Sequence, residues 1–398
     1  MRAIIVGGSI AGLFTANMLE RAGWDVVVVE RTGEALSSRG AGVVTHPELF
    51  AGLEAAGLTP DDIETVAVDG RILFGADGSR EQTLHLPQRL VAWGELHGRL
   101  ESVWGTSRVM RGASVVGYEE SENSVSVQLT DGRSLTADVL IGADGLRSTV
   151  RRLMLPDEAP IYAGYVAWRG LVAEEDLSPD VAADLMNCFS FGFPAGEQIL
   201  GYPVGRPGGA SADLGRQLNY VWYRPVEDPD QLQAMFTDAN GKVHRDGIPP
   251  ALLLPTILAD MRREAVRVLP PQLAAAVQAT RQPLLQPIYD YAASRMASGR
   301  VALVGDAAAV ARPHCGMGVT KAGSDAVALS RALAASPDDV PAALQHYDAQ
   351  RRPTDLALMH HAQELGASIG SGKPAVSAME GQRLMRAVAV APELGLTG

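Results

Sequence analysis

A glycine-rich turn near the amino terminus limits the folds open to this chain more than any other feature. The apolar run of residues 3–6 leads into Gly-Gly-Ser-Ile-Ala-Gly at residues 7–12, and apolar residues recur at helical spacing over residues 10–18. A second apolar run, Val-Val-Val-Val, follows at residues 26–29. This order of strand, turn, helix and strand predicts a βαβ unit with parallel strands and a right-handed crossover.

The turn matches the dinucleotide fingerprint in part. Gly7 and Gly12 stand where G-x-G-x-x-G requires glycine, whereas Ser9 replaces the second glycine. Glu30 ends the second strand, where a carboxylate accepts hydrogen bonds from an adenosine ribose and disfavours a 2′-phosphate. The segment therefore predicts FAD or NAD rather than NADP. The alternative is a glycine-rich turn beside a surface glutamate.

Two later segments have the same strand-then-turn character. Residues 138–151 read DVLIGADGLRSTVR, and residues 299–326 begin GRVALVGDAAAVARPHCGMG. Asp306 follows the buried strand of the later segment, and its carboxylate can bond a chain of sugar-like hydroxyls. The glycines after it open a helix, whose first backbone N–H groups can stabilise negative charge on a reduced flavin ring.

The material between these segments is aromatic and strand-like, with helical patterns after it. We expect an α/β (α+β) chain, in which an antiparallel-sheet substrate domain is inserted into a Rossmann-like FAD-binding domain and C-terminal helices follow. We expect the connection at residues 205–216 to be an exposed loop or hairpin tip. The predicted boundaries are 1–70, 87–160 and 275–365 for the FAD-binding domain, 71–86 and 161–274 for the substrate domain, and 366–398 for a C-terminal tail.

Composition excludes several classes of partner. The formal net charge of −12 argues against nucleic acid and anionic membranes. The two cysteines lie far apart and form neither a disulfide framework nor a metal site, which favours a reducing compartment. No uninterrupted apolar run is long enough to span a bilayer. We expect a soluble cytoplasmic enzyme without a metal. Its oligomeric state stays open, a homodimer included.

The three motifs, in this order and at these separations, resemble the FAD-dependent aromatic hydroxylases, which are single-component flavoprotein monooxygenases. Within that family, the strings GGSI, YAGYVAWRG (residues 162–170) and ARPH (residues 311–314) are similar to the hydroxylases of hydroxypyridines. The resemblance implies FAD, NADH or NADPH as co-substrate, and O2. We expect the FAD to be non-covalent, because no histidine or cysteine stands in a flavin-attachment motif. It also implies hydroxylation of a small aromatic or heteroaromatic compound through a flavin hydroperoxide.

The resemblance also implies roles for single residues. The ADP half of FAD would be held by Gly7, Ser9, Ile10, Ala11, Gly12, Glu30 and Arg31. The flavin edge would lie along Arg39 and Gly42, and the pyrophosphate and NAD(P)H path near Asp144 and Gly145. The ribityl chain would bind Gly305 and Asp306, and the flavin ring would be lined by Pro313, Gly316, Met317 and Gly318. The chain departs from the family pattern at Trp93, Ala309 and Thr320, where Arg, His and Asn are common.

An electron-rich ring becomes more nucleophilic when its hydroxyl loses a proton, so a base or relay is useful. The candidates are His46, Tyr202, Tyr220 and His314. For each of them the alternative is an ordinary hydrogen-bond partner at the edge of the core. Two other functions also remain: a related flavoprotein that acts as an epoxidase, reductase or oxidase, and a nucleotide-binding sensor without catalysis.

Overall fold

The computed structural model describes residues 1–33, 42–105, 108–206, 215–245 and 247–390. Its strands are β1 (Arg2–Val6), β2 (Asp25–Glu30), β3 (Gly42–Val44), β4 (Val66–Phe74), β5 (Arg80–Ala92), β6 (Val109–Arg111), β7 (Val115–Glu120), β8 (Val125–Leu129), β9 (Ser134–Ala137), β10 (Val139–Gly142), β11 (Ile161–Ala173), β12 (Phe189–Gly192), β13 (Gln198–Gly205), β14 (Arg216–Pro225), β15 (Leu284–Ala292), β16 (Ala297–Ser298), β17 (Val301–Leu303) and β18 (Ala309–Val310). Its α-helices are α1 (Ile10–Arg21), α2 (Pro47–Ala55), α3 (Trp93–Trp104), α4 (Thr149–Met154), α5 (Pro179–Leu185), α6 (Pro229–Met235), α7 (Pro255–Val268), α8 (Pro271–Ala279), α9 (Gly318–Ala335), α10 (Val340–Leu365) and α11 (Ala378–Ala387).

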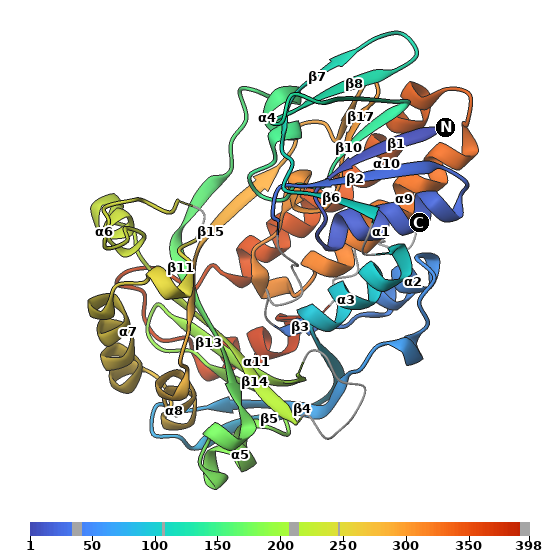
Figure 1. Cartoon of the computed structure of the whole chain (residues 1–398). Coiled ribbons are helices and arrows are strands. Elements are labelled where there is room, and N and C mark those ends of the chain that lie inside the picture. Colours follow the sequence, from blue (N-terminus) through green and yellow to red (C-terminus); the bar gives the residue numbers. More distant parts are fainter. Residues whose placement is uncertain (34–41, 106–107, 207–214, 246, 391–398) are drawn as a thin grey trace.

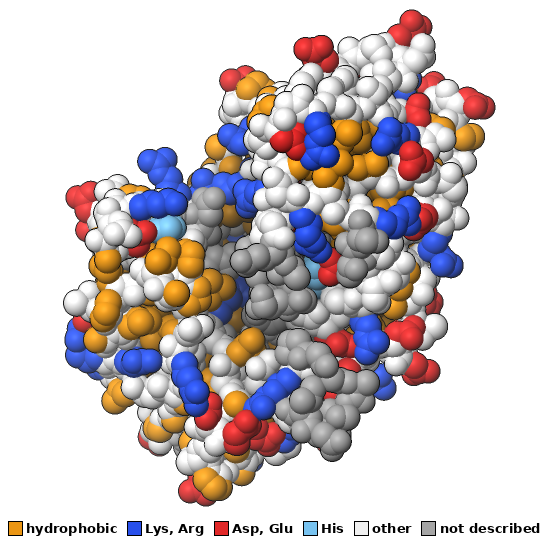
Figure 2. Space-filling model, viewed as in Figure 1, with side chains coloured by type: hydrophobic (Ala, Val, Ile, Leu, Met, Phe, Trp, Pro, Cys, Tyr) orange, Lys and Arg blue, Asp and Glu red, His pale blue; other side chains and the backbone are white. Residues whose placement is uncertain are grey.

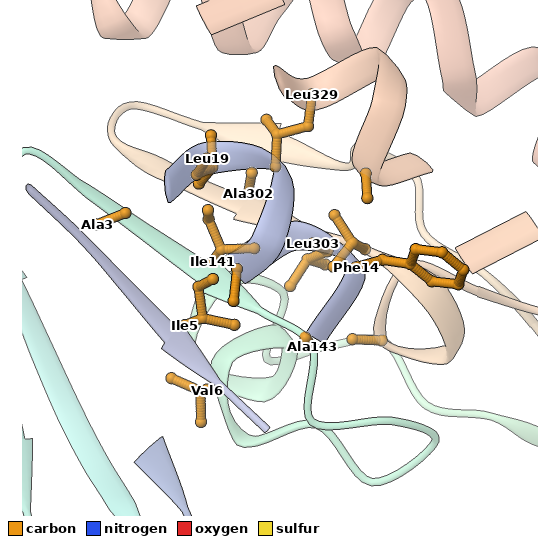
Figure 3. Packing of buried hydrophobic residues seen from close by; sticks show 14 of the residues in the cluster. Ala3, Ile5, Val6, Phe14, Leu19, Ile141, Ala143, Ala302, Leu303 and Leu329 are labelled. Carbon is orange, nitrogen blue, oxygen red and sulfur yellow. The ribbon is translucent and has the colours of Figure 1, made fainter. Parts of the chain in front are cut away.

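A six-stranded sheet with the order β16-β17-β10-β1-β2-β6 forms one part of the molecule, and its neighbours from β17 to β6 are parallel (Figure 1). The helices α1 and α9 pack on it, and Ile5, Ile141 and Leu303 of the strands lie close to Phe14 of α1 and Leu329 of α9 (Figure 3). These strands are buried on both faces, which explains their uninterrupted apolar runs. The predicted βαβ unit and the return of the two later strands to the same sheet are confirmed.

A nine-stranded sheet forms the other part, with the order β18-β15-β11-β14-β13-β12-β4-β5-β3. Its neighbours are antiparallel except for the parallel pair β12 and β4. Side chains alternate between two cores along β14, because successive residues of a strand point to opposite faces. Tyr220 and Trp222 pack with residues of α7 and α8, whereas Val221 and Tyr223 belong to the core on the other face.

The nine-stranded sheet takes in more of the chain than the boundaries drawn from the sequence. The strands β3 and β15 join it although residues 1–70 and 275–365 were expected in the FAD-binding part, and β5 runs on past residue 86 to Ala92. Backbone pairing explains the difference, since β15 bonds along β11 in the register Trp168↔Leu285. The expected hairpin at 205–216 is confirmed at its base by the pair Gly205↔Arg216, and its tip lies outside the described residues.

Charged side chains of both signs are interspersed over the face seen in Figure 2, so the negative charge of the chain is not gathered there into one acidic patch. Within the described part of the chain, none of the helices combines the length and the apolar character that crossing a membrane requires.

Candidate functional site

A cavity of about 640 Å³ is lined by residues of both large sheets. At one end it meets the glycine-rich turn after β1 and the carboxyl end of β2. At the other end it meets the aromatic face of the nine-stranded sheet, with Phe189, Tyr202 and Tyr223. The cavity therefore joins two surfaces of different chemistry.

The turn after β1 can be built only with glycine at two positions. Gly7 has φ +110°, and a Cβ on it would lie 2.4 Å from the carbonyl oxygen of Ala143. A Cβ on Gly12 would lie 1.8 Å from the carbonyl oxygen of Gly7. Ser9 precedes α1 without a side-chain capping bond, so the first N–H groups of the helix remain available to an anion. Ser9, Ile10 and Ala11 line the cavity, and Gly12 lies behind them.

Glu30 is held at the end of β2 with only 6% of its surface exposed. Its Oε2 accepts a hydrogen bond from the N–H of Gly8 at 2.8 Å, and its Oε1 accepts one from the N–H of Thr32 at 2.8 Å. Glu30 and Arg31 both line the cavity. A carboxylate fixed there beside a turn that requires glycine fits the adenosine end of FAD.

The second motif caps a helix and is tied to the third. The carboxylate of Asp144 accepts the N–H of Thr149 at 2.6 Å at the start of α4, and Asp144 and Gly145 line the cavity. The buried guanidinium of Arg151 donates to the carbonyl of Leu146 and, at 3.3 Å, to that of Ala307. Arg151 thereby fixes one turn against the other. It is a residue of the motif that the predicted site left out.

A buried ion cluster, consisting of Lys321, Asp325, Arg351 and Asp355, holds the turn of the third motif. Lys321 Nζ lies 2.7 Å from Asp325 Oδ2 and 2.8 Å from Asp355 Oδ2, and it donates to the carbonyl of Gly305 at 2.9 Å. Arg351 closes the cluster with contacts of 2.9 Å to both carboxylates. Four buried charges on α9 and α10 therefore fix the position of Gly305.

Asp306 follows that turn and faces the cavity, whereas Gly305 lies behind the wall. The surrounding protein raises the pKa of Asp306 by removing water, and Lys321 opposes that shift. Its side chain is nevertheless accessible from the cavity. A carboxylate in this position can accept hydrogen bonds from the hydroxyls of a ribityl chain.

The loop before α9 contributes backbone to the cavity wall. Pro313, Gly316 and Gly318 line it, and Gly316 adopts φ +67° at the end of a short turn. Met317 does not line it, because its side chain is fully buried in the core against the nine-stranded sheet. Among the other predicted positions, Gly42 lines the cavity, and Arg39 lies outside the described residues.

The segment after α11 forms another part of the wall. Ala389 lines the cavity, has φ +54°, and donates its N–H to the carbonyl of His314 at 2.9 Å. The fully buried Arg71 of β4 fixes this segment by donating to the carbonyls of Met385 and Val388 at 2.5 and 2.6 Å. This region is only a tail in the boundaries drawn from the sequence, and no local signal marks it as part of a site.

Two of the four candidate bases reach the cavity. His314 is fully buried at its wall, with Nε2 2.8 Å from the hydroxyl of Tyr165. Burial, with Arg312 and Arg169, lowers the pKa of His314 to about 3, so its ring is neutral. Tyr202 also lines the cavity, and burial raises the pKa of its hydroxyl.

The other two candidates lie elsewhere. His46 is buried behind the wall, with Nδ1 3.0 Å from Thr320 Oγ1, and burial lowers its pKa to about 4. Tyr220 lies on the opposite face of the nine-stranded sheet, among residues of α7 and α8. Neither residue lines the cavity, so the structure does not bring them to the same site as His314 and Tyr202.

Two residues of the cavity, Trp93 and Arg169, were not among the predicted site residues, although Trp93 was named as a departure from the family pattern. Trp93 lines the cavity and stacks on His97 with ring centroids 4.9 Å apart. Arg169 of β11 lines it at the aromatic end. A charged residue in an otherwise apolar and aromatic strand was the available signal for Arg169.

The chain is similar to known proteins over nearly its whole length. A family model described as FAD binding domain matches residues 1–192 and 274–362. A 2,6-dihydroxypyridine 3-monooxygenase of Paenarthrobacter nicotinovorans is 30% identical over 94% of each chain. The solved structure of 2,6-dihydroxypyridine-3-hydroxylase from Arthrobacter nicotinovorans superposes with a TM-score of 0.89 at 29% identity, covering 99% of this chain and 97% of the other. Klebsiella pneumoniae HpxO, solved with FAD and uric acid, superposes with a TM-score of 0.73 at 25% identity, covering 97% and 93%.

Proposed function

The chain belongs to the FAD binding domain family and is an FAD-dependent aromatic hydroxylase, as its three motifs indicated, and from that membership we propose a specific reaction. The enzyme uses FAD, NADH or NADPH, and O2 to hydroxylate a small heteroaromatic compound of the hydroxypyridine type. Relatives named for this activity and for urate hydroxylation support a heteroaromatic ring as the substrate.

The observation that carries the proposal is one continuous cavity with a wall at the glycine-rich turn and a wall of aromatic side chains. The dinucleotide end offers Glu30, Asp306 and the N-terminus of α1, and the opposite end offers Phe189, Tyr202 and Tyr223. A ring bound on the aromatic face would lie beside a flavin whose ADP part occupies the glycine-rich turn. A nucleotide-binding sensor has no need of the second wall.

The chain's own residues fit the cofactor. Ser9, Ile10 and Glu30 would hold the ADP part, Asp306 the ribityl chain, and the backbone of residues 316–318 the flavin ring. Bound FAD supplies activation of O2 with electrons from the nicotinamide co-substrate. The N-terminus of α9 places the positive end of a helix dipole beside the residues assigned to the ring, which favours negative charge there.

The aromatic wall orients the substrate and excludes water. The hydroxyl of Tyr202 makes no hydrogen bond to another described residue and can bond a ring hydroxyl or ring nitrogen. His314 is a poor acceptor of a proton at neutral pH, because its pKa is about 3. We therefore assign it to orientation of the wall through Tyr165, and not to storage of the substrate's proton.

A substrate screen tests this function. Purified protein loaded with FAD is offered hydroxylated pyridines, purines and benzoates, and NADH and NADPH oxidation is followed with and without each compound. The expected result is stimulated oxidation and a product that gains one oxygen atom from ¹⁸O₂. Acid precipitation should release the yellow flavin into the supernatant, because it is not covalently held. Stimulated oxidation with no labelled product would favour an oxidase or reductase instead.

A further inference from the structure

Arg169 is a cation without an ion-pair partner among the residues that the structure describes. It lies on β11 and points to the cavity face, on the same side of the strand as Tyr165 and Ala167. Its Nε is buried without a hydrogen-bond partner, and no carboxylate of the described residues lies within ion-pair distance of it. By contrast, Arg312, which also acts on His314, is paired with Asp290 at 2.7 Å.

The surroundings of Arg169 are apolar and aromatic. Its strand neighbours are Val221 and Leu284, which also line the cavity. The positive charge of Arg169 lowers the pKa of Tyr202, Tyr223 and His314. For the two tyrosines it opposes burial, which raises the pKa. The groups that face this cation are therefore neutral rings.

The acidic groups of the cavity belong to its other end. Glu30 is engaged by the N–H groups of Gly8 and Thr32, and Asp144 by the start of α4. Asp306 adjoins the buried ion cluster. A half-buried guanidinium without an anion is costly, and an incoming oxyanion recovers that cost through charge-assisted hydrogen bonds.

We propose that Arg169 binds an ionised oxygen carried by a flat aromatic or heteroaromatic substrate, either a ring oxide or a ring carboxylate. This inference rests on the proposed function and narrows its substrate class to anions. Where that oxygen is a ring oxide, the hydroxyl from which it forms gives up its proton to the solvent as the ring enters the cavity, because the adjacent cation lowers its pKa. This agrees with the two candidate bases at the cavity, Tyr202 and His314, because neither is suited to accept that proton at neutral pH.

The test compares anionic and neutral rings on the FAD-loaded protein. The probes are 2,6-dihydroxypyridine, 3-hydroxybenzoate and the neutral methyl ester of 3-methoxybenzoate, which has no proton to lose, with dissociation constants measured by calorimetry. Arg169→Gln should weaken binding of at least one anionic probe roughly 10- to 100-fold. It should change the affinity of the methyl ester less than twofold and leave FAD content unaltered. Whichever anion responds identifies the oxygen as ring oxide or carboxylate.

Two further variants sharpen the result. Arg169→Lys keeps the charge and should restore part of the lost affinity. Arg281→Gln removes an arginine that is 84% exposed in its side chain and lies off the cavity, and it should change nothing. The proposal fails if Arg169→Gln weakens the neutral ester as much as the anions, or if it weakens neither.

The outcomes separate this inference from the function on which it rests. If anions bind through Arg169 but no product gains oxygen, the reaction is wrong and the anion site stands. If hydroxylation occurs with unchanged anion affinity in Arg169→Gln, the reaction stands and the anion site falls. A raised KM for NADH or NADPH alone would place the co-substrate's phosphates at Arg169 and would also overturn the proposal.

Discussion

The hydroxyl of Tyr165 lies 2.8 Å from Nε2 of His314, and both side chains are buried between the nine-stranded sheet and the cavity. The ring of His314 also lies 4.1 Å, centroid to centroid, from that of Tyr223. The carbonyl of the same histidine accepts the N–H of Ala389. His314 therefore connects a strand, the loop before α9 and the C-terminal segment at one point of the cavity wall.

Tyr202→Phe should lower the rate of hydroxylation roughly 10- to 100-fold while FAD content stays unchanged. A site built to bond a ring hydroxyl loses both affinity and orientation when its own polar group is removed. NAD(P)H should still be consumed, with hydrogen peroxide formed in place of product. Product and peroxide are quantified in the same reaction.

Tyr220→Phe is the matched control for that variant. It also removes a buried hydroxyl from the nine-stranded sheet, but on the face away from the cavity. It should leave the ratio of product to peroxide unchanged. Equal uncoupling by both variants would mean that the tyrosine hydroxyl acts through stability of the sheet.

Acid should destabilise the protein through its buried histidines. The pKa of His314 is about 3 and that of His46 about 4, both below the ordinary value of 6.5. Between the lowered pKa of each histidine and 6.5, the unfolded chain binds a proton that the folded chain does not. The free energy of unfolding therefore falls as pH falls below 6.5. Each histidine should contribute about 1.4 kcal/mol per pH unit in that window.

Urea denaturation between pH 7 and pH 4.5 measures this effect. His314→Gln should flatten the dependence of the free energy of unfolding on pH. His360→Gln changes an exposed histidine and should leave the slope as it is in the unmodified protein. An identical slope in all three proteins would show that His314 becomes protonated without loss of the fold.

Glu30→Ala should weaken FAD binding by one to two orders of magnitude. The variant loses bonds from the ribose, each worth about 1.5–3 kcal/mol, and it also releases the N–H groups of Gly8 and Thr32. Flavin fluorescence titration of the apoprotein gives the dissociation constant. Glu54→Ala, at an exposed position of α2, should have no effect, and unchanged affinity in Glu30→Ala would disprove the assignment of the ribose site.

Lys321→Met should cost about 3–5 kcal/mol of unfolding free energy, because it leaves two buried carboxylates with only Arg351 between them. The turn at Gly305 also loses a hydrogen bond, so FAD retention should fall. Lys242→Met alters an exposed lysine and provides the comparison in chemical denaturation. A loss below about 1 kcal/mol would show that the remaining three charges rearrange without strain.

The sequence by itself determined the nucleotide-binding part of this protein. The order of β1, turn, α1 and β2 follows from local patterns within thirty residues. The steric need for glycine at Gly7 and Gly12 and the place of Glu30 at the end of β2 agree with what their spacing predicts. Periodicity within one segment is enough for such a unit, since the contacts that define it lie close together along the chain. The hairpin strands β13 and β14 were predicted for the same reason.

Only the tertiary structure decided which distant residues share the cavity. Tyr202 pairs with Asn219, so Tyr220, one residue further along β14, points to the opposite face. A strand's side chains alternate, and a shift of β14 by one residue in register would have brought Tyr220 to the cavity face beside Tyr202. Arg169 and Ala389 likewise reach one cavity from segments more than two hundred residues apart. Local sequence patterns do not reveal that these residues lie close together, because it is the pairing between strands and the packing between layers that place them there.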